Sequence, residues 1–352
     1  MTFLENAHGG IVFMDPWPFA MPFVCEEWPV ALTRHGLHFR RPNQRLSDVS
    51  GSETESPLAY DAIHSIEQRD ANVVVNQCRS IRCASTESAR ELSLWLRILT
   101  VGAESAHDEA IDNRLFKMTD TGAIRVRLAA LRRETHSVRI VSAVFFGLVF
   151  GIGTLCLYLP HRVTGLIWVC AAGLLALWLF VIRSFSIAHK RLYPEGGREH
   201  RRQMAMMLLS PVAAMRAPAL LSRNLLSGFH PLAAASVLCP EIAFRDLARR
   251  ALLKLRYDVA AQAGNNRCGQ DDTAASFDGR LLRHLERVVI QAGIDVSELL
   301  EAPSPDLGAK SYCPRCHAQF IFAEGPCLEC GGIAAREFVR TPRGGRPQSS
   351  KV

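Results

Sequence analysis

Four cysteines near the carboxyl-terminal end carry the clearest chemical pattern in this chain of 352 residues. They form two Cys-x-x-Cys pairs, Cys313/Cys316 and Cys327/Cys330, separated by ten residues. Two thiolates at positions i and i+3 can bind one ion, because the turn between them directs both sulfurs to the same side. A hairpin between the pairs would close a tetrahedron. The spacing therefore predicts one metal site with four sulfur ligands, in preference to a redox disulfide.

Residues 310–335 look like a zinc ribbon of the four-cysteine type. In this reading Gln319–Phe322 forms a strand, Gly325–Pro326 forms the turn, and Gly331 gives a permissive backbone after the second pair. Zinc is the expected ion, and iron is the alternative because rubredoxin uses the same ligand set. Since four sulfurs complete the shell, we expect His317 to be a solvated side chain. A closed site of this kind is structural, with no position for water or substrate.

Two uncharged stretches lie near the middle of the chain. Ile140–Pro160 has 21 residues and Val163–Ile182 has 20, with only His161 and Arg162 between them. At about 1.5 Å per residue each stretch is roughly 30 Å long as a helix, which matches the hydrocarbon core of a bilayer. Buried helices of a soluble domain are the alternative, but such helices rarely lack a charged face for so long. We therefore predict a transmembrane hairpin over residues 139–183.

Basic residues flank the hairpin unevenly. The 20 residues before the first stretch contain five arginines, the 20 after the second contain six Lys/Arg, and the connection contains Arg162 alone. The positive-inside rule then places both termini in the cytosol, with the chain in the cell (inner) membrane. Apart from the Tyr158 phenol near the end of the first stretch, the only ionisable groups in the two stretches are the thiols of Cys156 and Cys170. This favours an anchor over a channel, pump or carrier.

Small residues give the hairpin a candidate packing surface. Gly147 and Gly151 form a GxxxG motif in the first stretch, and Gly173 lies in the second. Such residues allow helix backbones to approach closely. The motif predicts close packing either within the hairpin or between two copies in a homo-oligomer.

Charge and cysteine usage restrict the partners and the compartment. Residues 139–352 carry 26 Lys/Arg against 16 Asp/Glu, whereas residues 1–138 carry 15 against 18. A basic surplus beside an apolar segment suggests anionic lipid first and nucleic acid second. The cysteine count of 11 is odd, and four of these cysteines have metal-site spacing, which favours a reducing compartment.

Residues 30–100 show the pattern of a small β-rich domain that ends in a helix. The expected strands are Val30–Thr33, Gly36–Arg41, Ala59–Ile66, Val73–Val75 and Ser80–Ala84. Ser85 or Thr86 can cap a helix that runs through Leu99, in which apolar residues recur at helical spacing. Residues 1–29 are expected to be irregular, because prolines interrupt them.

The segments ALTRHGLHFRR, PLAYDAIHSIEQ and NVVVNQCRSIRCASTESARELSLWLRIL together resemble the bacterial pleckstrin-homology-like (PH-like) domains. Tyr60, Ile63 and Ile66 match the Y-x-x-I-x-x-I strand of that family, and Ala89–Leu99 matches the helix that closes its barrel. The resemblance implies a module that binds lipid or protein and has no catalysis of its own. Family members differ in what they bind, so the resemblance carries over no ligand residue.

The remaining segments are expected to be mainly helical. Residues 101–138 form charged juxtamembrane helices, of which Ala123–Arg139 runs into the first apolar stretch. Residues 184–262 form a helical cytosolic region, and residues 263–278 a polar linker. An amphipathic helix over 279–302 follows, and residues 336–352 are a disordered basic tail. In the helical region one apolar face is predicted to pack on neighbouring helices rather than on the bilayer surface; it contains Ile242, Phe244, Leu247, Ala251, Leu252 and Leu255.

No catalytic motif accompanies these segments: the sequence has no P-loop, HExxH, GxSxG or Gly-rich dinucleotide turn. His230 and the pair Asp271/Asp272 are the candidate catalytic groups, and a structural or solvated role explains each more simply. We therefore expect a membrane-anchored adaptor or regulator that recruits a cytosolic protein partner, and no enzyme. Two alternatives stay open: nucleic-acid binding through ribbon and tail, and a membrane enzyme without a recognisable motif.

Overall fold

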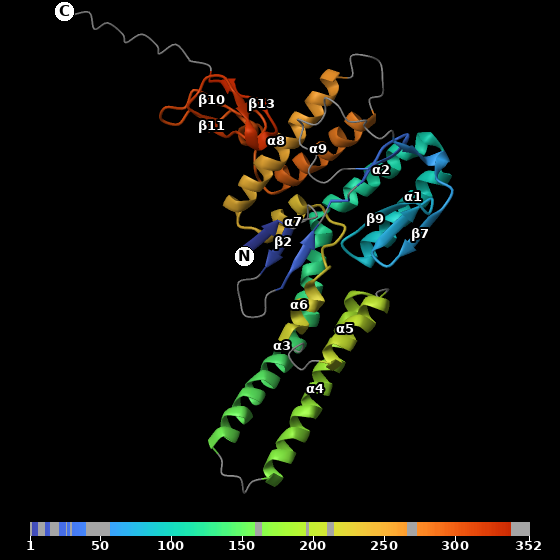
Figure 1. Cartoon of the computed structure of the whole chain (residues 1–352), viewed down its shortest axis with the longest axis vertical. Helices are drawn as coiled ribbons and strands as arrows, with labels where there is room; N and C mark the ends of the chain where they lie inside the picture. The colour runs from blue at the N-terminus through green and yellow to red at the C-terminus, as the bar shows by residue number, and fades with distance from the viewer. Residues whose placement is uncertain are drawn as a thin grey trace, which may run out of the picture.

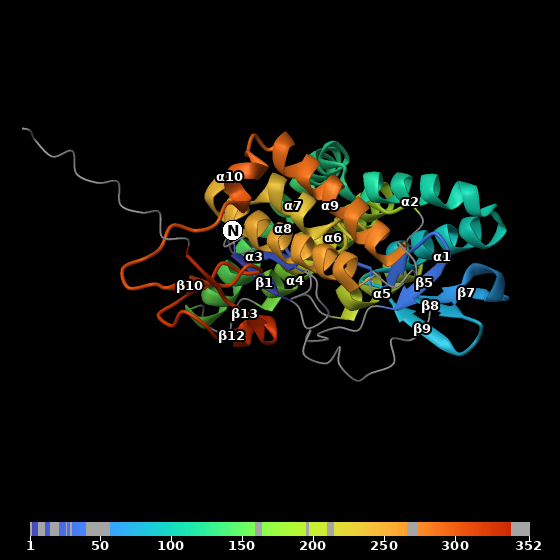
Figure 2. The same ribbon diagram turned by 90° about the horizontal axis from the view of Figure 1, so that it is seen from above.

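The computed structural model describes residues 2–5, 11–14, 21–25, 27–28, 30–39, 57–158, 164–194, 197–209, 215–265 and 273–338. Small antiparallel sheets and helices form a body, from which two long helices project side by side (Figure 1). Seen from above, the carboxyl-terminal strands and the β7–β9 sheet lie at opposite ends of the body, with helices between them (Figure 2).

The first strands form a three-stranded antiparallel sheet in the order β1-β2-β3. They are β1 (Thr2–Glu5), β2 (Ile11–Met14) and β3 (Phe23–Cys25). The expectation that residues 1–29 are irregular is wrong for these strands. The prolines of this segment exclude a helix, but they fall outside the three strands, so apolar residues can still pair there. Phe13 and Cys25 are fully buried as a result.

Two further sheets follow, each with three antiparallel strands. The first contains β4 (Val30–Leu32), β5 (Gly36–Phe39) and β6 (Leu58–Ala59), and the second contains β7 (Ile66–Arg69), β8 (Asn72–Val75) and β9 (Arg79–Arg82). β4 and β5 pair around Arg34 and His35, as expected. A side chain at Gly36 would lie 2.5 Å from the Leu58 carbonyl oxygen, so this close pairing with β6 requires glycine.

The strand predicted over Ala59–Ile66 is wrong in its centre. Residues Tyr60–Ala62 form a short 3-10 helix, and β7 begins only at Ile66. The Tyr60 hydroxyl donates a 2.8 Å hydrogen bond to the Thr33 carbonyl across the β4–β5 turn. The buried Tyr60 side chain is therefore held at a turn between the two sheets, where an extended strand was predicted.

Helix α1 (Thr86–Val101) packs on the β7–β8–β9 sheet. Ser85 caps it, because the serine Oγ accepts the Ser88 N–H at 3.0 Å. Leu92, Leu96 and Leu99 recur at helical spacing and are buried. This sheet and helix form the first half of the body.

Two helices leave the body without a break in their backbone. After α2 (Glu104–Thr119), α3 runs from Thr121 to Tyr158 over 38 residues, so the charged segment and the first apolar stretch are one helix. α4 (Thr164–Leu192) returns beside it. Both helices are long and apolar enough to cross a membrane, and only 17% of the apolar window of each is buried in the protein. The connection at 159–163, including Arg162, lies outside the described residues.

Six helices complete the body. They are α5 (Gly197–Leu209), α6 (Ala217–Ser222), α7 (Pro231–Leu238), α8 (Glu241–Asn265), α9 (Thr273–Gln291) and α10 (Val296–Leu300). α8 packs on α7 and α9 and buries Phe244 and Leu252, but Ile242, predicted on the same face, is 87% exposed. The predicted linker over 263–278 is too long, because α8 and α9 occupy both of its ends; residues 266–272 lie outside the described part.

Short strands end the described chain. β10 (Ser311–Tyr312), β11 (Gln319–Phe320) and β14 (Arg336–Glu337) form one sheet, and β12 (Pro326–Cys327) pairs with β13 (Ile333–Ala334). The tail predicted to be disordered over 336–352 therefore begins with a strand, because Tyr312 of β10 pairs with Arg336. Residues 339–352 lie outside the described residues.

Candidate metal centre

The four cysteines come together between the two small sheets. The sulfur atoms of Cys313, Cys316, Cys327 and Cys330 all lie within 4.8 Å of one another. Sγ of Cys316 and Sγ of Cys327 are 3.8 Å apart. For metal–sulfur bonds of about 2.3 Å, the edge of a regular tetrahedron is about 3.8 Å. The cluster is therefore a candidate metal site with room for one ion.

The first pair lies in a tight turn after β10. The His317 N–H donates to the Cys313 carbonyl at 2.8 Å, and the Cys313 N–H donates to the Ala318 carbonyl at 2.9 Å. His317 has a left-handed backbone with φ of 61°, a conformation that favours glycine. It closes the turn with its backbone, and its imidazole is not among the clustered groups.

The second pair lies in an equivalent turn that begins at Cys327, the last residue of β12. Leu328–Cys330 form a 3-10 turn that ends at Gly331, where φ is 76°. The Gly332 N–H then donates to the Cys327 carbonyl at 2.9 Å. The permissive backbone expected at Gly331 is present, and it lets the chain reverse with both sulfurs on one side.

The electrostatics of the cluster fit a bound cation. Burial, followed by the proximity of Cys313, raises the pKa of Cys316 to about 11. Burial, and then the neighbouring Cys316, also raise the pKa of Cys330. The pKa of Cys313 is lowered instead, because hydrogen bonds, first from the backbone of Arg315 and Cys316, outweigh its burial. A cation between the sulfurs would stabilise the thiolates that serve as its ligands. The donor set is chemically suited to a soft or borderline metal ion.

The metal-site segment is docked on α8. Arg315, between the first two cysteines, forms an ion pair of 3.0 Å with Asp258, and both side chains are mostly buried. Tyr257 packs against the cysteine cluster from the same helix. Sequence reasoning missed these two α8 residues, because an ion pair across 57 positions leaves no local pattern.

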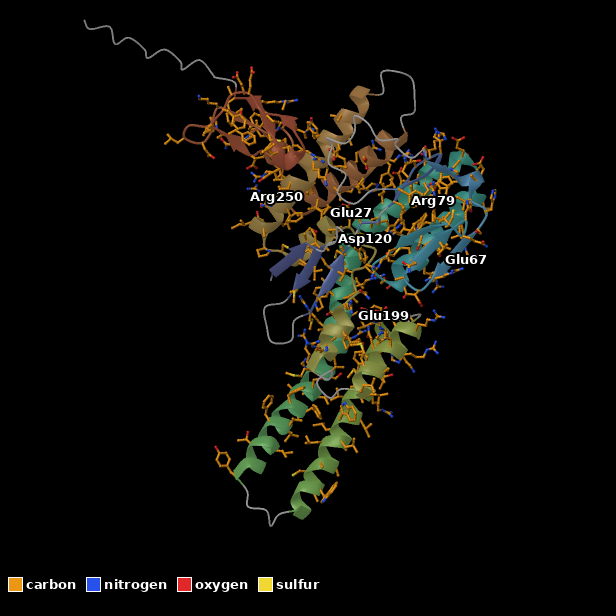
Figure 3. All side chains as sticks on the ribbon, viewed as in Figure 1. Glu27, Glu67, Arg79, Asp120, Glu199 and Arg250 are labelled. Carbon is orange, nitrogen blue, oxygen red and sulfur yellow. The ribbon has the colours of Figure 1, made fainter. Side chains whose placement is uncertain are left out.

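The two other candidate sites differ in what the structure shows of them. His230 caps α7, since its Nδ1 accepts the Leu232 N–H at 3.2 Å, and its Nε2 lies 2.6 Å from a carboxylate oxygen of Glu27. Glu27 is exposed, and Figure 3 labels it on the body, away from the cysteine cluster. This is a structural role for His230. Asp271 and Asp272 lie outside the described residues.

No known protein family, curated protein or solved structure matches this chain. The assignment of residues 30–100 to PH-like domains therefore stays a prediction.

Proposed function

We propose that the protein is a membrane-anchored adaptor or regulator, which holds its body and a zinc ribbon at a bilayer surface to recruit a cytosolic protein. The observation that carries this proposal is the pair of apolar helices that project from the body (Figure 1). A core helix of a soluble protein would be mostly buried, whereas these apolar windows are only 17% buried. Large side chains such as Phe150, Trp168 and Phe180 are exposed on them. Lipid is the medium that makes such exposure favourable.

The charges at the base of the hairpin support an orientation. Arg132 and Arg133 on α3, and Arg183, Lys190 and Arg191 on α4, lie toward the body end of these helices. Cationic residues are retained on the cytosolic side of a membrane. The proposal therefore places the body, and with it both ends of the chain, in the cytosol at the inner face of the cell membrane.

The amino-terminal half of the body is proposed to be a PH-like head. Its support is two three-stranded antiparallel sheets, β4–β6 and β7–β9, followed by α1 on the second sheet. This arrangement agrees with the resemblance in order of elements, although Tyr60–Ala62 departs from the family's middle strand. Such a head would bind lipid or protein beside the bilayer.

The ribbon is proposed to hold zinc, with iron as the alternative, and to present a rigid surface to the partner. Ile321 and Leu328 are 78% and 84% exposed on it, and we propose them as its apolar contacts with the partner. Nucleic acid is a weaker candidate. Phe320 stacks on Phe322 at 4.8 Å, so these rings face each other rather than a row of bases.

The membrane topology is tested with a thiol reagent that does not cross membranes. Cys78 is an exposed cysteine of the body. We expect the chain to require detergent for extraction, and Cys78 to react only after the cells are permeabilised. A Cys78→Ser variant controls for labelling elsewhere. Extraction by alkaline carbonate without detergent, or labelling of Cys78 on intact cells, would contradict the proposal.

The adaptor role is tested through the exposed ribbon residues. The double variant Ile321→Ser/Leu328→Ser is expected to lose the proteins that co-purify with the full chain while it keeps its metal. Leu307→Ser, an exposed leucine before β10, is the matched control. If the same proteins co-purify with all three chains, the ribbon is not the recruiting surface.

A further inference from the structure

A cavity of about 140 Å³ lies where α4 joins the body, enclosed by the start of α1, the end of α4, α5 and α6. A water molecule occupies about 30 Å³, so the space admits a larger molecule. Glu199, one of its walls, lies at the junction between the long helices and the body (Figure 3). The polar and charged residues that line it include Glu87, Arg90, His189, Glu199 and Gln203.

Two of these side chains are buried and incompletely hydrogen-bonded. His189 is 2% exposed and Gln203 is 7% exposed. Within the described part of the chain, neither Nδ1 of His189 nor Oε1 of Gln203 has a hydrogen-bond partner. The amide oxygen can only accept, and Nδ1 accepts when the ring proton is on Nε2. Unpaired buried acceptors are unfavourable, so a molecule that donates hydrogen bonds would be stabilised here.

The charges on the walls select a cation over an anion. Glu199 accepts hydrogen bonds from Asn224 at 2.8 Å and from Gln203 Nε2 at 3.4 Å, which leaves the amide oxygen of Gln203 as the atom of that side chain without a partner. Glu87 adds a second carboxylate and pairs with Arg127 at 3.2 Å. Arg90 is the only Lys or Arg among the described lining residues. The cavity therefore offers mainly acceptors.

The start of α1 also borders the cavity, and its dipole would favour an anion. However, Ser85 Oγ accepts a first-turn N–H, from Ser88. Glu87 lies in the same turn and offsets the partial positive charge. The helix end therefore does not reverse the preference for a cation.

The position of the cavity indicates where its ligand comes from, an argument that rests on the proposed membrane anchor. His189 follows Ile182, the last residue of the second uncharged stretch, by seven residues. That interval is about 10 Å of helix, whereas the headgroup layer is about 5–8 Å thick on each side, so the cavity lies just beyond the headgroups. The ammonium group is the outermost part of an ethanolamine headgroup, so it is the part of the lipid nearest to this depth.

We propose that this cavity binds a primary ammonium group, and that its source is the ethanolamine headgroup of a phospholipid. The ammonium would donate to the Glu199 carboxylate, and to Gln203 Oε1 and His189 Nδ1 after these side chains rotate toward it, because each of these two atoms has less than 1 Å² exposed. Leu192 and Pro194 supply an apolar wall for the two methylene groups. A choline headgroup carries the same charge but has no N–H donor, so the site distinguishes the two.

The first test compares short-chain lipids bound to the full chain in detergent, measured by native mass spectrometry. We expect dihexanoyl phosphatidylethanolamine to bind at least about tenfold more tightly than dihexanoyl phosphatidylcholine, the effect of one charge-assisted hydrogen bond. Free ethanolamine is a third arm. Equal affinity for free ethanolamine and for the lipid would assign the site to a soluble amine of the same chemistry.

The second test uses substitutions that are expected to change lipid binding in opposite directions. Glu199→Gln and Gln203→Leu each remove an acceptor and are expected to weaken ethanolamine-lipid binding about tenfold. Gln203→Glu keeps the shape but replaces the donor to Glu199 with a second carboxylate; because the ammonium relieves the repulsion between the two carboxylates, binding is expected to tighten. The exposed Glu241→Gln on α8 is the matched control and should leave binding unchanged. A merely structural role for Gln203 would weaken binding in both of its variants.

Equal affinity for the two lipids would overturn the inference. So would equal affinity of the Glu199→Gln and Glu241→Gln variants for the ethanolamine lipid. A third contrary result would be a density map of the chain with that lipid in which the cavity holds only ordered water. These results are distinct from failure of the anchor proposal. A chain that does not insert into bilayers refutes the anchor. A chain that inserts but does not prefer the ethanolamine lipid refutes the cavity assignment alone.

Discussion

At the scale of single residues, the four cysteine sulfurs decide how the ribbon would bind a metal ion. Four sulfur ligands fill a tetrahedral site and leave no coordination position for water or substrate. Each Cys-x-x-Cys turn needs one left-handed backbone position, which His317 occupies in the first turn and Gly331 in the second. Because the described ribbon has only two-residue strands and a small apolar cluster, it has little core of its own. A bound metal ion would therefore supply most of its folding free energy, of order 10–16 kcal/mol in comparable peptides.

Cys316→Ser is expected to abolish stoichiometric metal binding and to unfold the ribbon while the rest of the body stays folded. The three remaining thiolates cannot complete a closed tetrahedral site. The measurement is metal content of the purified chain, together with proteolysis of residues 310–338. Cys78→Ser, at an exposed cysteine remote in sequence, should keep the metal. Full metal occupancy in Cys316→Ser would show that these sulfurs are not the ligands.

His284 on α9 should make the body sensitive to acid. Its Nε2 lies 3.9 Å from Asp112, but burial, followed by Arg287, lowers the pKa of His284 below the ordinary value of about 6.5. Between these two pKa values the unfolded chain binds more protons than the folded chain. Stability is therefore lost as the pH falls through about 6.5 and stops falling below the lowered pKa.

The variant His284→Gln removes this group, so we expect its melting temperature to fall less than that of the original chain between about pH 7.5 and pH 5.5. The exposed His64→Gln is the control and should show the original dependence. The comparison uses the difference between chains, because other groups, including the metal ligands, also titrate on acidification. If the melting temperature of His284→Gln depended on pH as that of the original chain does, His284 would not be the source of the acid sensitivity.

At the scale of elements, the ribbon is fixed to α8 by few contacts. Arg315 and Asp258 form the ion pair, and Tyr257 contributes apolar packing. The pair is less exposed than a surface salt bridge and less buried than a core one, so breaking it should cost about 1–2 kcal/mol of docking free energy. We therefore expect docking and metal binding to be separable.

Asp258→Ala is expected to release the ribbon from α8 without loss of metal. Cleavage in the proline-containing segment 301–310 should then become roughly 5- to 30-fold faster in limited proteolysis, since opening there becomes easier. Glu241→Ala, at the exposed start of the same helix, should cleave at the original rate. Loss of metal in Asp258→Ala would mean that docking and the metal site form one cooperative unit.

How far the sequence predicted these elements depends on the range of the interactions involved. The Cys-x-x-Cys turns, the Ser85 cap and the uncharged helices follow from residues close together in the chain, and the structure has all of them. The β1–β3 sheet was missed, because the prolines indicate where a helix cannot form and say nothing of strands between them. The cavity beside Glu199 was invisible, since its walls come from four segments whose meeting no local pattern encodes.

At the scale of the whole molecule, the small residues of the hairpin are open to a second copy. Within the described part of the chain, nothing lies within 4 Å of a Cβ placed at Gly147 or Gly151. The alternative that these glycines pack α3 against α4 is therefore wrong. The alternative that these glycines pack two copies together stays a prediction, because a helix from another copy could approach this face closely.

Gly151→Leu should weaken self-association while leaving the fold of one chain intact. A leucine there meets no atom of its own chain but would separate two helices that cross at the glycines. The measurement is energy transfer between donor- and acceptor-labelled chains in the same bilayer. Gly153→Leu is the control, because it lies about 200° around the helix from Gly151. Equal transfer in the two variants would exclude this face as an interface.

The unbroken course of α3 has a mechanical consequence. A single helix of 38 residues has a length of about 57 Å, and it begins inside the body and ends at the far end of the hairpin. No loop or hinge interrupts it, so it behaves as a stiff lever arm. If the bilayer becomes thinner and the hairpin tilts to match it, the body must swing with it, and the ribbon at its edge travels farthest. Bilayer thickness would then set how far the ribbon stands from the lipid surface.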